Sequence, residues 1–268
     1  MRYFEISPSR VLAPYIKTYW FLEGNFPVAG AQPERIFPDG CMELIIHYGD
    51  VFQRITENKA EKQPAGFVFG QLEEYIELLP GQATGVMGIK FYPHGLSHFT
   101  DVPVNEIKQQ AIELPHLFKK EGYYLDEKVA LAKAARDRVK VVEDFLLRQL
   151  RGSKRNSELI NIMVQDIYTA NGSIAIRDLI RKYHTTERQM ERFFAIQVGL
   201  SAKTFSRIIR FQRSFQLAPH AKTLTHLALD AGYFDQAHFS REFRSFTGLS
   251  PRQYFNSQNQ FSSLFLDD

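Results

Sequence analysis

Two arginines, Arg192 and Arg241, stand 49 residues apart in segments of similar sequence. Each is followed two residues later by Phe and then, at the same spacing, by a Gly-Leu-Ser triplet that starts at Gly199 or Gly248. A planar guanidinium can bind two acceptor atoms at once, so a repeated Arg suits recognition of an acidic partner. No carboxylate pair and no nucleophile with a base stands out in the sequence. The chemistry indicated is binding, not catalysis.

The residues around Arg192 predict two short helices. Ser173 could cap the first, and an apolar stripe at helical spacing follows in residues 176–183. After a break at residues 184–185, Thr186 with Gln189 three residues later predicts a capping box. The second helix should turn Met190, Phe193 and Phe194 inward and Arg188, Glu191, Arg192 and Ala195 outward.

The residues around Arg241 repeat this pattern. Thr225 could open a first helix, Gly232 supplies a tight turn, and Asp235 is a capping residue 49 positions after Thr186. Phe234 and Phe239 occupy the two positions of a hydrophobic staple. The outward face of the second helix then carries Gln236, Ala237, Ser240, Arg241 and Arg244.

Residues 201–217 predict one helix that connects the two units, and the sequence 218–220 (Ala-Pro-His) should end it. Two short helices joined by a tight turn describe a helix-turn-helix. A solenoid would need about three or more repeats, and two are present. A plain helical domain with solvated charges stays open as an alternative for one unit alone, but packing does not require an exposed Arg at both equivalent positions.

The sequence from about residue 156 to 255 resembles the DNA-binding domain of the AraC family of transcription regulators. The run 227–254 (LALDAGYFDQAHFSREFRSFTGLSPRQY) is similar to the family signature over nearly its whole length. The resemblance implies two helix-turn-helix units, at about 173–198 and 224–247, that place two recognition helices in successive major-groove segments on one face of the DNA. It implies base contacts by Arg188, Glu191, Arg192, Gln236, Ala237, His238 and Arg241. It implies phosphate contacts by Thr186 and Ser240.

Three of these positions carry further expectations. Outward Arg244 is a candidate for a third phosphate contact. Ala237 can read only a thymine methyl group. Glu191 could accept a hydrogen bond from a cytosine amino group or pair with Arg188 or Arg192.

Composition agrees with a reader of nucleic acid and excludes some alternatives. Residues 1–145 hold 16 Lys and Arg against 20 Asp and Glu, a net −4, whereas residues 146–268 hold 17 against 10, a net +7. The single cysteine, Cys41, excludes an internal disulfide and the cysteine-rich zinc site of DNA-repair methyltransferases. No apolar run is long enough to span a membrane and no signal-peptide core is present, so we expect a cytoplasmic protein.

The first hundred residues read as short strands separated by turns, for example 42–48 after Pro38-Asp39-Gly40. This pattern of short strands and turns predicts a β-sandwich or barrel. A long segment, 126–150, keeps helical spacing of apolar residues, and 151–156 reads as a linker. The expected fold class is α+β: residues 1–150 form a mostly β, cupin-like domain with a helical tail, and residues 157–268 form an all-α domain.

Residues 12–118 resemble a sensor domain found in the AraC family, through 37–40 (FPDG) and 89–96 (IKFYPHGL). The resemblance implies a sensing role and no particular ligand. His94 and His98 lie four residues apart and His47 lies on a strand, but surface or internally bonded histidines are the simpler interpretation, so we expect no metal and no cofactor. Trp20 and its aromatic neighbours could line a pocket, although core packing is the simpler alternative.

The sequence therefore predicts a sequence-specific DNA-binding transcription regulator, not an enzyme, that responds to a small-molecule effector. The expected partners are double-stranded DNA, the effector, RNA polymerase and a second copy of the chain, and no membrane. Two other hypotheses stay open: a cupin-type metal enzyme with a DNA-targeting module, and a helical adaptor protein without DNA selectivity.

Overall fold

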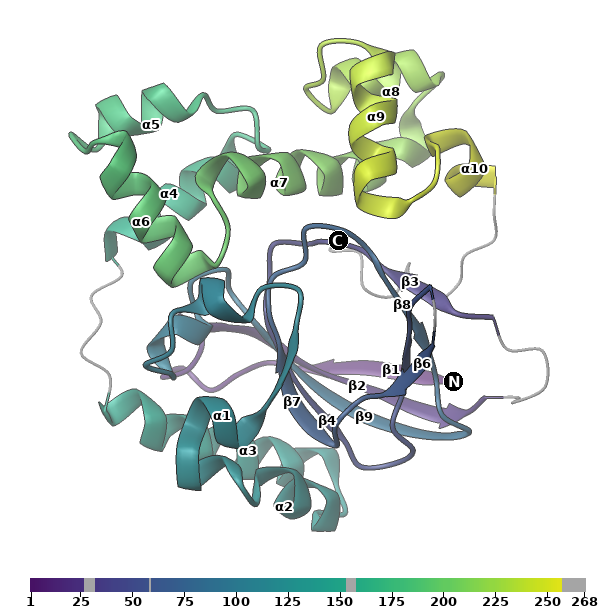
Figure 1. Cartoon of the computed structure of the whole chain (residues 1–268), viewed down its shortest axis with the longest axis vertical. Helices are drawn as coiled ribbons and strands as arrows, with labels where there is room; N and C mark the ends of the chain where they lie inside the picture. Colours follow the sequence, from purple (N-terminus) through teal and green to yellow (C-terminus); the bar gives the residue numbers. More distant parts are fainter. Residues whose placement is uncertain (27–31, 58, 153–157, 257–268) are drawn as a thin grey trace.

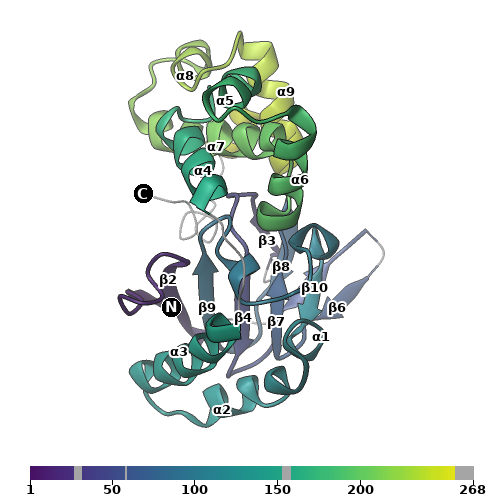
Figure 2. The same ribbon diagram turned by 90° about the vertical axis from the view of Figure 1, so that its left-hand side faces the viewer.

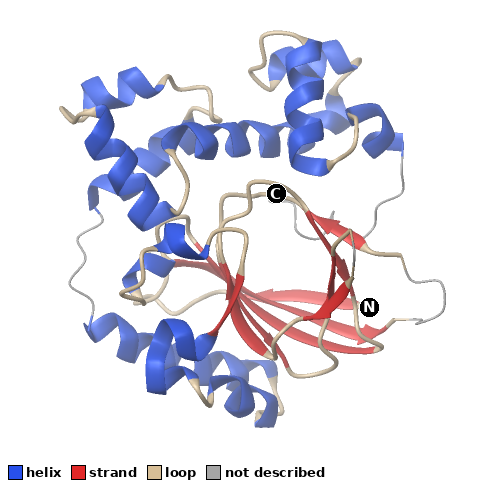
Figure 3. Cartoon of the chain, viewed as in Figure 1, coloured by secondary structure: helices blue, strands red, loops and turns tan. Residues whose placement is uncertain are grey.

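The computed structural model describes residues 1–26, 32–57, 59–152 and 158–256. The first part of the chain is mostly strands and the rest is helical (Figure 3). The helices α1–α3 follow the strands in the sequence and precede the C-terminal helices α4–α10. The helical part α4–α10 lies on one side of the β part, and α1–α3 lie on the opposite side (Figure 1). The expected α+β class, with a β-rich N-terminal part and a C-terminal part of paired helical units, is confirmed.

The β part is built from two antiparallel sheets. The larger has the order β1-β2-β9-β4-β7-β10 and the smaller the order β3-β8-β5-β6. The strands are β1 Arg2–Ile6, β2 Ile16–Asn25, β3 Glu34–Ile36, β4 Glu43–His47, β5 Gln53–Ile55, β6 Ala60–Lys62, β7 Gly66–Phe69, β8 Ile76–Leu79, β9 Ala83–Phe91 and β10 Ala111–Glu113. The turn residues Pro38-Asp39-Gly40 lie between β3 and β4, as the sequence predicted.

The central strands of the larger sheet, β4, β7 and β9, are buried on both faces, which explains their nearly continuous apolar sequences. Along β2, Tyr19 and Phe21 enter the cluster that packs against the helices, whereas Trp20 and Leu22 enter the cluster between the two sheets. Successive side chains of a strand point to opposite faces, so one strand supplies both clusters. Core clusters thus pack on both faces of the sheet, and one face of the sheet forms a wall of the space between the two sheets.

The segment predicted as one helix, residues 126–150, is two helices in the structure: α2 Leu125–Leu131 and α3 Ala135–Gly152. The backbone of Ala132 is extended, with φ −71° and ψ 129°. Val129 of α2 and Val142 of α3 nevertheless enter the same core cluster. The chain breaks because two shorter helices can both lay their apolar faces on the sheet, and helical spacing alone does not detect the bend.

Short helical segments complete this part: η1 Leu96–His98, η2 Val104–Ile107, α1 Leu114–Phe118 and η3 Lys119–Gly122. The predicted linker, 151–156, lies mostly outside the described residues. Within the described part of the chain, no helix is long and apolar enough to cross a membrane.

The C-terminal part is helical throughout. Its elements are α4 Glu158–Thr169, α5 Ile176–Lys182, α6 Glu187–Val198, α7 Ala202–Leu217, η4 Ala218–His220, α8 Leu224–Asp230, α9 Gln236–Thr247 and α10 Pro251–Asn256. Helix α7 runs between the α5–α6 pair and the α8–α9 pair (Figures 1 and 2). Its end at Leu217, two residues before Pro219, agrees with the sequence prediction.

Three local predictions in this part are wrong. Ser173 does not cap α5, which begins after Ala175 without a side-chain cap; Ser173 Oγ instead lies against Gly232. Thr223, not Thr225, caps α8 by accepting from the His226 amide. Phe234 forms no staple, since its side chain is 87% exposed. Ser173 lies against a distant turn, and the cap of α8 lies two residues before the predicted one.

Candidate DNA interface

Helix α6 is fixed at both ends by the residues that the sequence indicated. Thr186 Oγ1 accepts from the Gln189 amide at 3.2 Å, and Gln189 Oε1 accepts from the Thr186 amide at 3.1 Å, which completes the capping box. Gly199 ends the helix in the left-handed conformation, φ 84°. Met190 and Phe194 are buried. The caps and the buried face together set which side of α6 faces outward.

That outward side carries the three predicted base-reading residues of the first unit. Arg188, Glu191 and Arg192 are all exposed, and Arg188 lies about one helical turn before the other two. A shallow hollow at the beginning of the helix is lined by Thr186, Arg188, Gln189 and Arg192. The start of a helix offers free amide groups and a partial positive charge, which together favour a phosphate. The arrangement can hold a phosphate beside side chains that reach further out.

Helix α9 is built in the same way. Asp235 Oδ1 accepts from the His238 amide at 2.6 Å, and Gly248 ends the helix at φ 72°. Thr225 Oγ1 donates to Gln236 Oε1 at 2.7 Å, which ties α9 to α8. Most of the predicted DNA-contacting residues of α9 are exposed, and the remaining two are half-buried: Gln236, Ala237, Arg241 and Arg244 are exposed, whereas His238 and Ser240 are half-buried.

A buried acid that sequence reasoning missed holds α9 against α7. Glu242 accepts from Arg207 Nε at 2.7 Å and from Arg210 Nη2 at 3.2 Å. His238 Nε2 lies 3.9 Å from Glu242 Oε2. Arg207 and Arg210 lie three residues apart on α7, a spacing that could have suggested a shared acidic partner. The cluster fixes the angle at which α9 presents its outward face, and it holds one ring nitrogen of His238 toward the protein.

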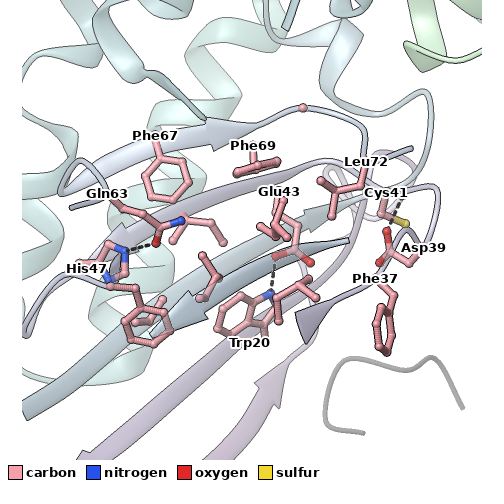
Figure 4. Close-up of a pocket in the computed structure, with 17 residues that line it drawn as sticks. Trp20, Phe37, Asp39, Cys41, Glu43, His47, Gln63, Phe67, Phe69 and Leu72 are labelled. Atoms are coloured by element: carbon pink, nitrogen blue, oxygen red, sulfur yellow. Dashed lines mark hydrogen bonds between the residues drawn. The ribbon is translucent and has the colours of Figure 1, made fainter. Parts of the chain in front are cut away.

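The space between the two sheets is a second candidate site. It contains a cavity of about 100 Å³ with mostly apolar walls. His47 and Gln63 lie at one end of the labelled row in Figure 4, Asp39 and Cys41 lie at the other, and Glu43 lies between them. Trp20 lines the cavity and also belongs to the buried cluster between the sheets, whereas Tyr19 and Phe21 pack in the core on the opposite face of the strand.

The polar groups of the cavity are held by neighbours inside the protein. Trp20 Nε1 donates to Glu43 Oε2 at 3.2 Å, and Lys90 Nζ lies 2.7 Å from Asp39 Oδ2. His47 Nε2 and Gln63 Oε1 are 3.2 Å apart. Burial lowers the pKa of His47 to about 4, so its imidazole is neutral at physiological pH. The cavity suits a small, largely apolar molecule that can hydrogen-bond at one end.

The two histidines with metal-ligand spacing are buried side by side. The His94 and His98 rings are 6.2 Å apart, and burial together with the nearby His98 lowers the pKa of His94 to about 4. Within the described residues, no group of three or more His, Cys, Asp or Glu side chains could hold a metal ion.

Two capped helix pairs, joined by a long helix and attached to a β part with an internal cavity, define a paired helix-turn-helix protein. Comparison with known families agrees. Residues 179–257 match a family described as helix-turn-helix domain, and residues 4–113 match a domain of unknown function (DUF6597). The C-terminal part of the chain therefore carries an AraC-type helix-turn-helix domain, and the N-terminal part carries a domain of a different family.

Relatives with curated names share part of the chain. An HTH-type transcriptional regulator of Haemophilus influenzae is 28% identical over 118 residues, which are 44% of this chain and 38% of that protein. The Msm operon regulatory protein of Streptococcus mutans is 24% identical over 117 residues, 42% of each. The chain thus matches about two fifths of the length of these relatives.

The arrangement of the whole chain also has a counterpart among solved structures. ToxT from Vibrio cholerae superposes with a TM-score of 0.50 over 92% of this chain and 98% of that chain, at 11% sequence identity. The two chains share a fold.

Proposed function

We propose that this chain is a sequence-specific DNA-binding transcription regulator. The observation that carries the proposal is the pair of capped recognition helices, α6 and α9, with Arg192 and Arg241 exposed at equivalent positions. Packing does not require an exposed Arg at either position. Two guanidinium groups on successive helices can each bind a guanine edge in the major groove.

The proposal assigns base reading and backbone contacts to separate residues. Base edges are read by Arg188, Glu191, Arg192, Gln236, Ala237, His238 and Arg241, and phosphates are bound by Thr186, Ser240 and Arg244. The hollow at the beginning of α6 supports the role of Thr186, since its lining includes two arginines. The contact of His238 with Glu242 leaves it one ring nitrogen for a base.

We infer that residues 1–150 act as the sensor and that the effector occupies the cavity between the sheets. The size and apolar walls of the cavity support a small molecule as the ligand. The proposal assigns no reaction to the chain. It includes contact with RNA polymerase and pairing with a second copy of the chain, which sedimentation of the protein with and without DNA-bound polymerase would test.

A gel shift of the full chain on fragments of its own genome tests the proposal. We expect a few fragments to be retained in the presence of excess non-specific DNA. The double variant Arg192→Ala/Arg241→Ala, which changes only exposed side chains, should retain none of them. Uniform retention of all fragments, or equal retention by the variant, contradicts sequence-specific reading by these helices. A helical adaptor would retain none with either protein.

A further inference from the structure

One short segment of the β part, residues 35–40, lies between the cavity and the helical part. It comprises the last two residues of β3 and the turn after them, and it is pinned to the larger sheet. Asp39 pairs with Lys90 of β9 at 2.7 Å and accepts from the Cys41 amide at 2.8 Å. Gly40 takes the left-handed conformation, φ 79°, and its carbonyl accepts from Gln71 Nε2 at 2.9 Å. The 35–40 segment is therefore rigidly connected to the walls of the cavity.

The aromatic ring of this segment belongs to the core of the other part. Phe37 is 6% exposed and enters the helical core cluster instead of either β cluster. Its ring centroid lies 6.3 Å from Phe211, 6.1 Å from Phe215 and 5.5 Å from Tyr254. Aromatic pairs at these separations attract each other in addition to the area they bury. The helical core thus includes a side chain from the β part.

Polar contacts fix the segment to the same elements. Gln212 Nε2 of α7 donates to the Pro38 carbonyl at 2.6 Å, and Arg35 Nη1 donates to the Thr247 carbonyl, at the end of α9, at 2.9 Å. The backbone of Gly40 lies so close to α7 that a Cβ there would be 2.7 Å from the Phe205 ring. The contacts reach α7, α9 and α10, which build and support the second helix-turn-helix unit.

The same segment forms part of the cavity wall. Ile36, Phe37 and Asp39 of the segment line the cavity. Phe37 and Asp39 lie at the end away from His47 (Figure 4). A molecule in the cavity that contacts this end must therefore press on residues that hold the second unit. Two sites whose contacts share one rigid element have a coupling free energy, and that coupling is reciprocal.

We propose that the 35–40 segment couples the cavity to the second helix-turn-helix unit, so that occupancy of the cavity changes how α9 is presented to DNA. This inference rests on the proposed function. Phe37 acts as the main mechanical contact, and Gln212 and Arg35 hold the backbone in register on either side of it.

Reciprocity gives a test that needs no effector, because Trp20 is the only tryptophan of the chain and lines the cavity. The probe is a DNA duplex that the wild-type chain selects from a random library. Binding is followed by anisotropy of a labelled duplex, and Trp20 is followed in the same samples by its emission and by acrylamide quenching. In the wild type, the Trp20 signal should change with the same midpoint as DNA binding.

Variants separate the segment from the cavity itself. Phe37→Ala should still bind DNA, but its DNA-induced Trp20 change should fall below half that of the wild type. Phe52→Ala is the matched control, since Phe52 lines the same cavity beside His47 and should keep the change. Gln212→Ala removes one hydrogen bond to the segment without opening a core, and should reduce the change even if Phe37→Ala does not fold.

The outcomes distinguish the two proposals. DNA binding by the wild type without a Trp20 change overturns the coupling and leaves the proposed function standing. The role of the segment is also overturned if both Phe37→Ala and Gln212→Ala keep at least half of the wild-type DNA-induced Trp20 change. It is overturned as well if Phe52→Ala loses as much of this change as Phe37→Ala does. If the wild type selects no duplex at all, the proposed function fails, and the role of the segment fails with it.

Discussion

Replacing Glu242 with Ala should destabilise the helical part, because it removes the shared partner of two arginines. The carboxylate is 5% exposed and accepts from two arginines, one 17% and one 36% exposed. Removing one partner of a buried ion pair typically costs about 3–5 kcal/mol, because the remaining charges lose their partner. Both arginines can partly reach water, so the lower end, about 3 kcal/mol, is the expected loss. For a domain of about 100 residues this corresponds to a fall in Tm of roughly 12 °C or more.

Thermal and urea unfolding of the full chain, followed by far-UV circular dichroism, measures this loss. Glu191→Ala is the control, since it removes an exposed acid from the outward face of α6. Surface changes of this kind cost within about 0.5 kcal/mol. Glu242→Gln keeps an acceptor and should lie between the two. A free energy of unfolding for Glu242→Ala within about 0.5 kcal/mol of the wild type would refute the assignment of Glu242 as the acid that fixes α9 on α7.

Other predictions concern the β part and the turns. Burial lowers the pKa of His47 and of His94 to about 4, whereas the same histidines in the unfolded chain have a pKa near 6.5. The unfolded chain therefore binds more protons, and the free energy of unfolding should fall as the pH drops from about 6.5 to 4, by about 2 kcal/mol for each histidine at pH 5. His47→Gln should remove the share of His47 when unfolding at pH 7 is compared with unfolding at pH 5. Gly232 has φ 84° and a Cβ there would lie 2.5 Å from Ser173 Oγ, so Gly232→Ala should cost more than about 1 kcal/mol in urea unfolding, whereas an unchanged midpoint would contradict the tight turn. Cys41 is buried, so Cys41→Ser should keep DNA binding in a gel shift; loss of binding with an intact fold would point to a role for the thiol.

Several local features of the helix-turn-helix units could be predicted from the sequence. Caps such as Thr186 with Gln189, and Asp235, act within one helical turn, so the residues that form them are close together in the sequence. The buried aromatics of α6 and α9 follow from helical spacing for the same reason. The outward positions of Arg192 and Arg241 are then fixed by geometry.

Contacts between distant residues could not be predicted in this way. Phe37 lies 174 positions before Phe211, and its sequence context reads as an ordinary turn of a β domain. The break between α2 and α3 depends on how both helices fit one sheet, which periodicity does not record. The exposure of Phe234 likewise depends on the packing of α8 and α9, because a staple requires a neighbour at the correct distance.

Site selection from a random DNA library with the wild type, Arg192→Ala and Arg241→Ala tests the central claim most directly. Two recognition helices on one face of the DNA should read two clusters of bases about 10 base pairs apart. Each variant should lose preference in one cluster only, at a cost of about 1–3 kcal/mol. Equal weakening on all sequences, with the base preferences of both clusters unchanged, would contradict base reading by these arginines.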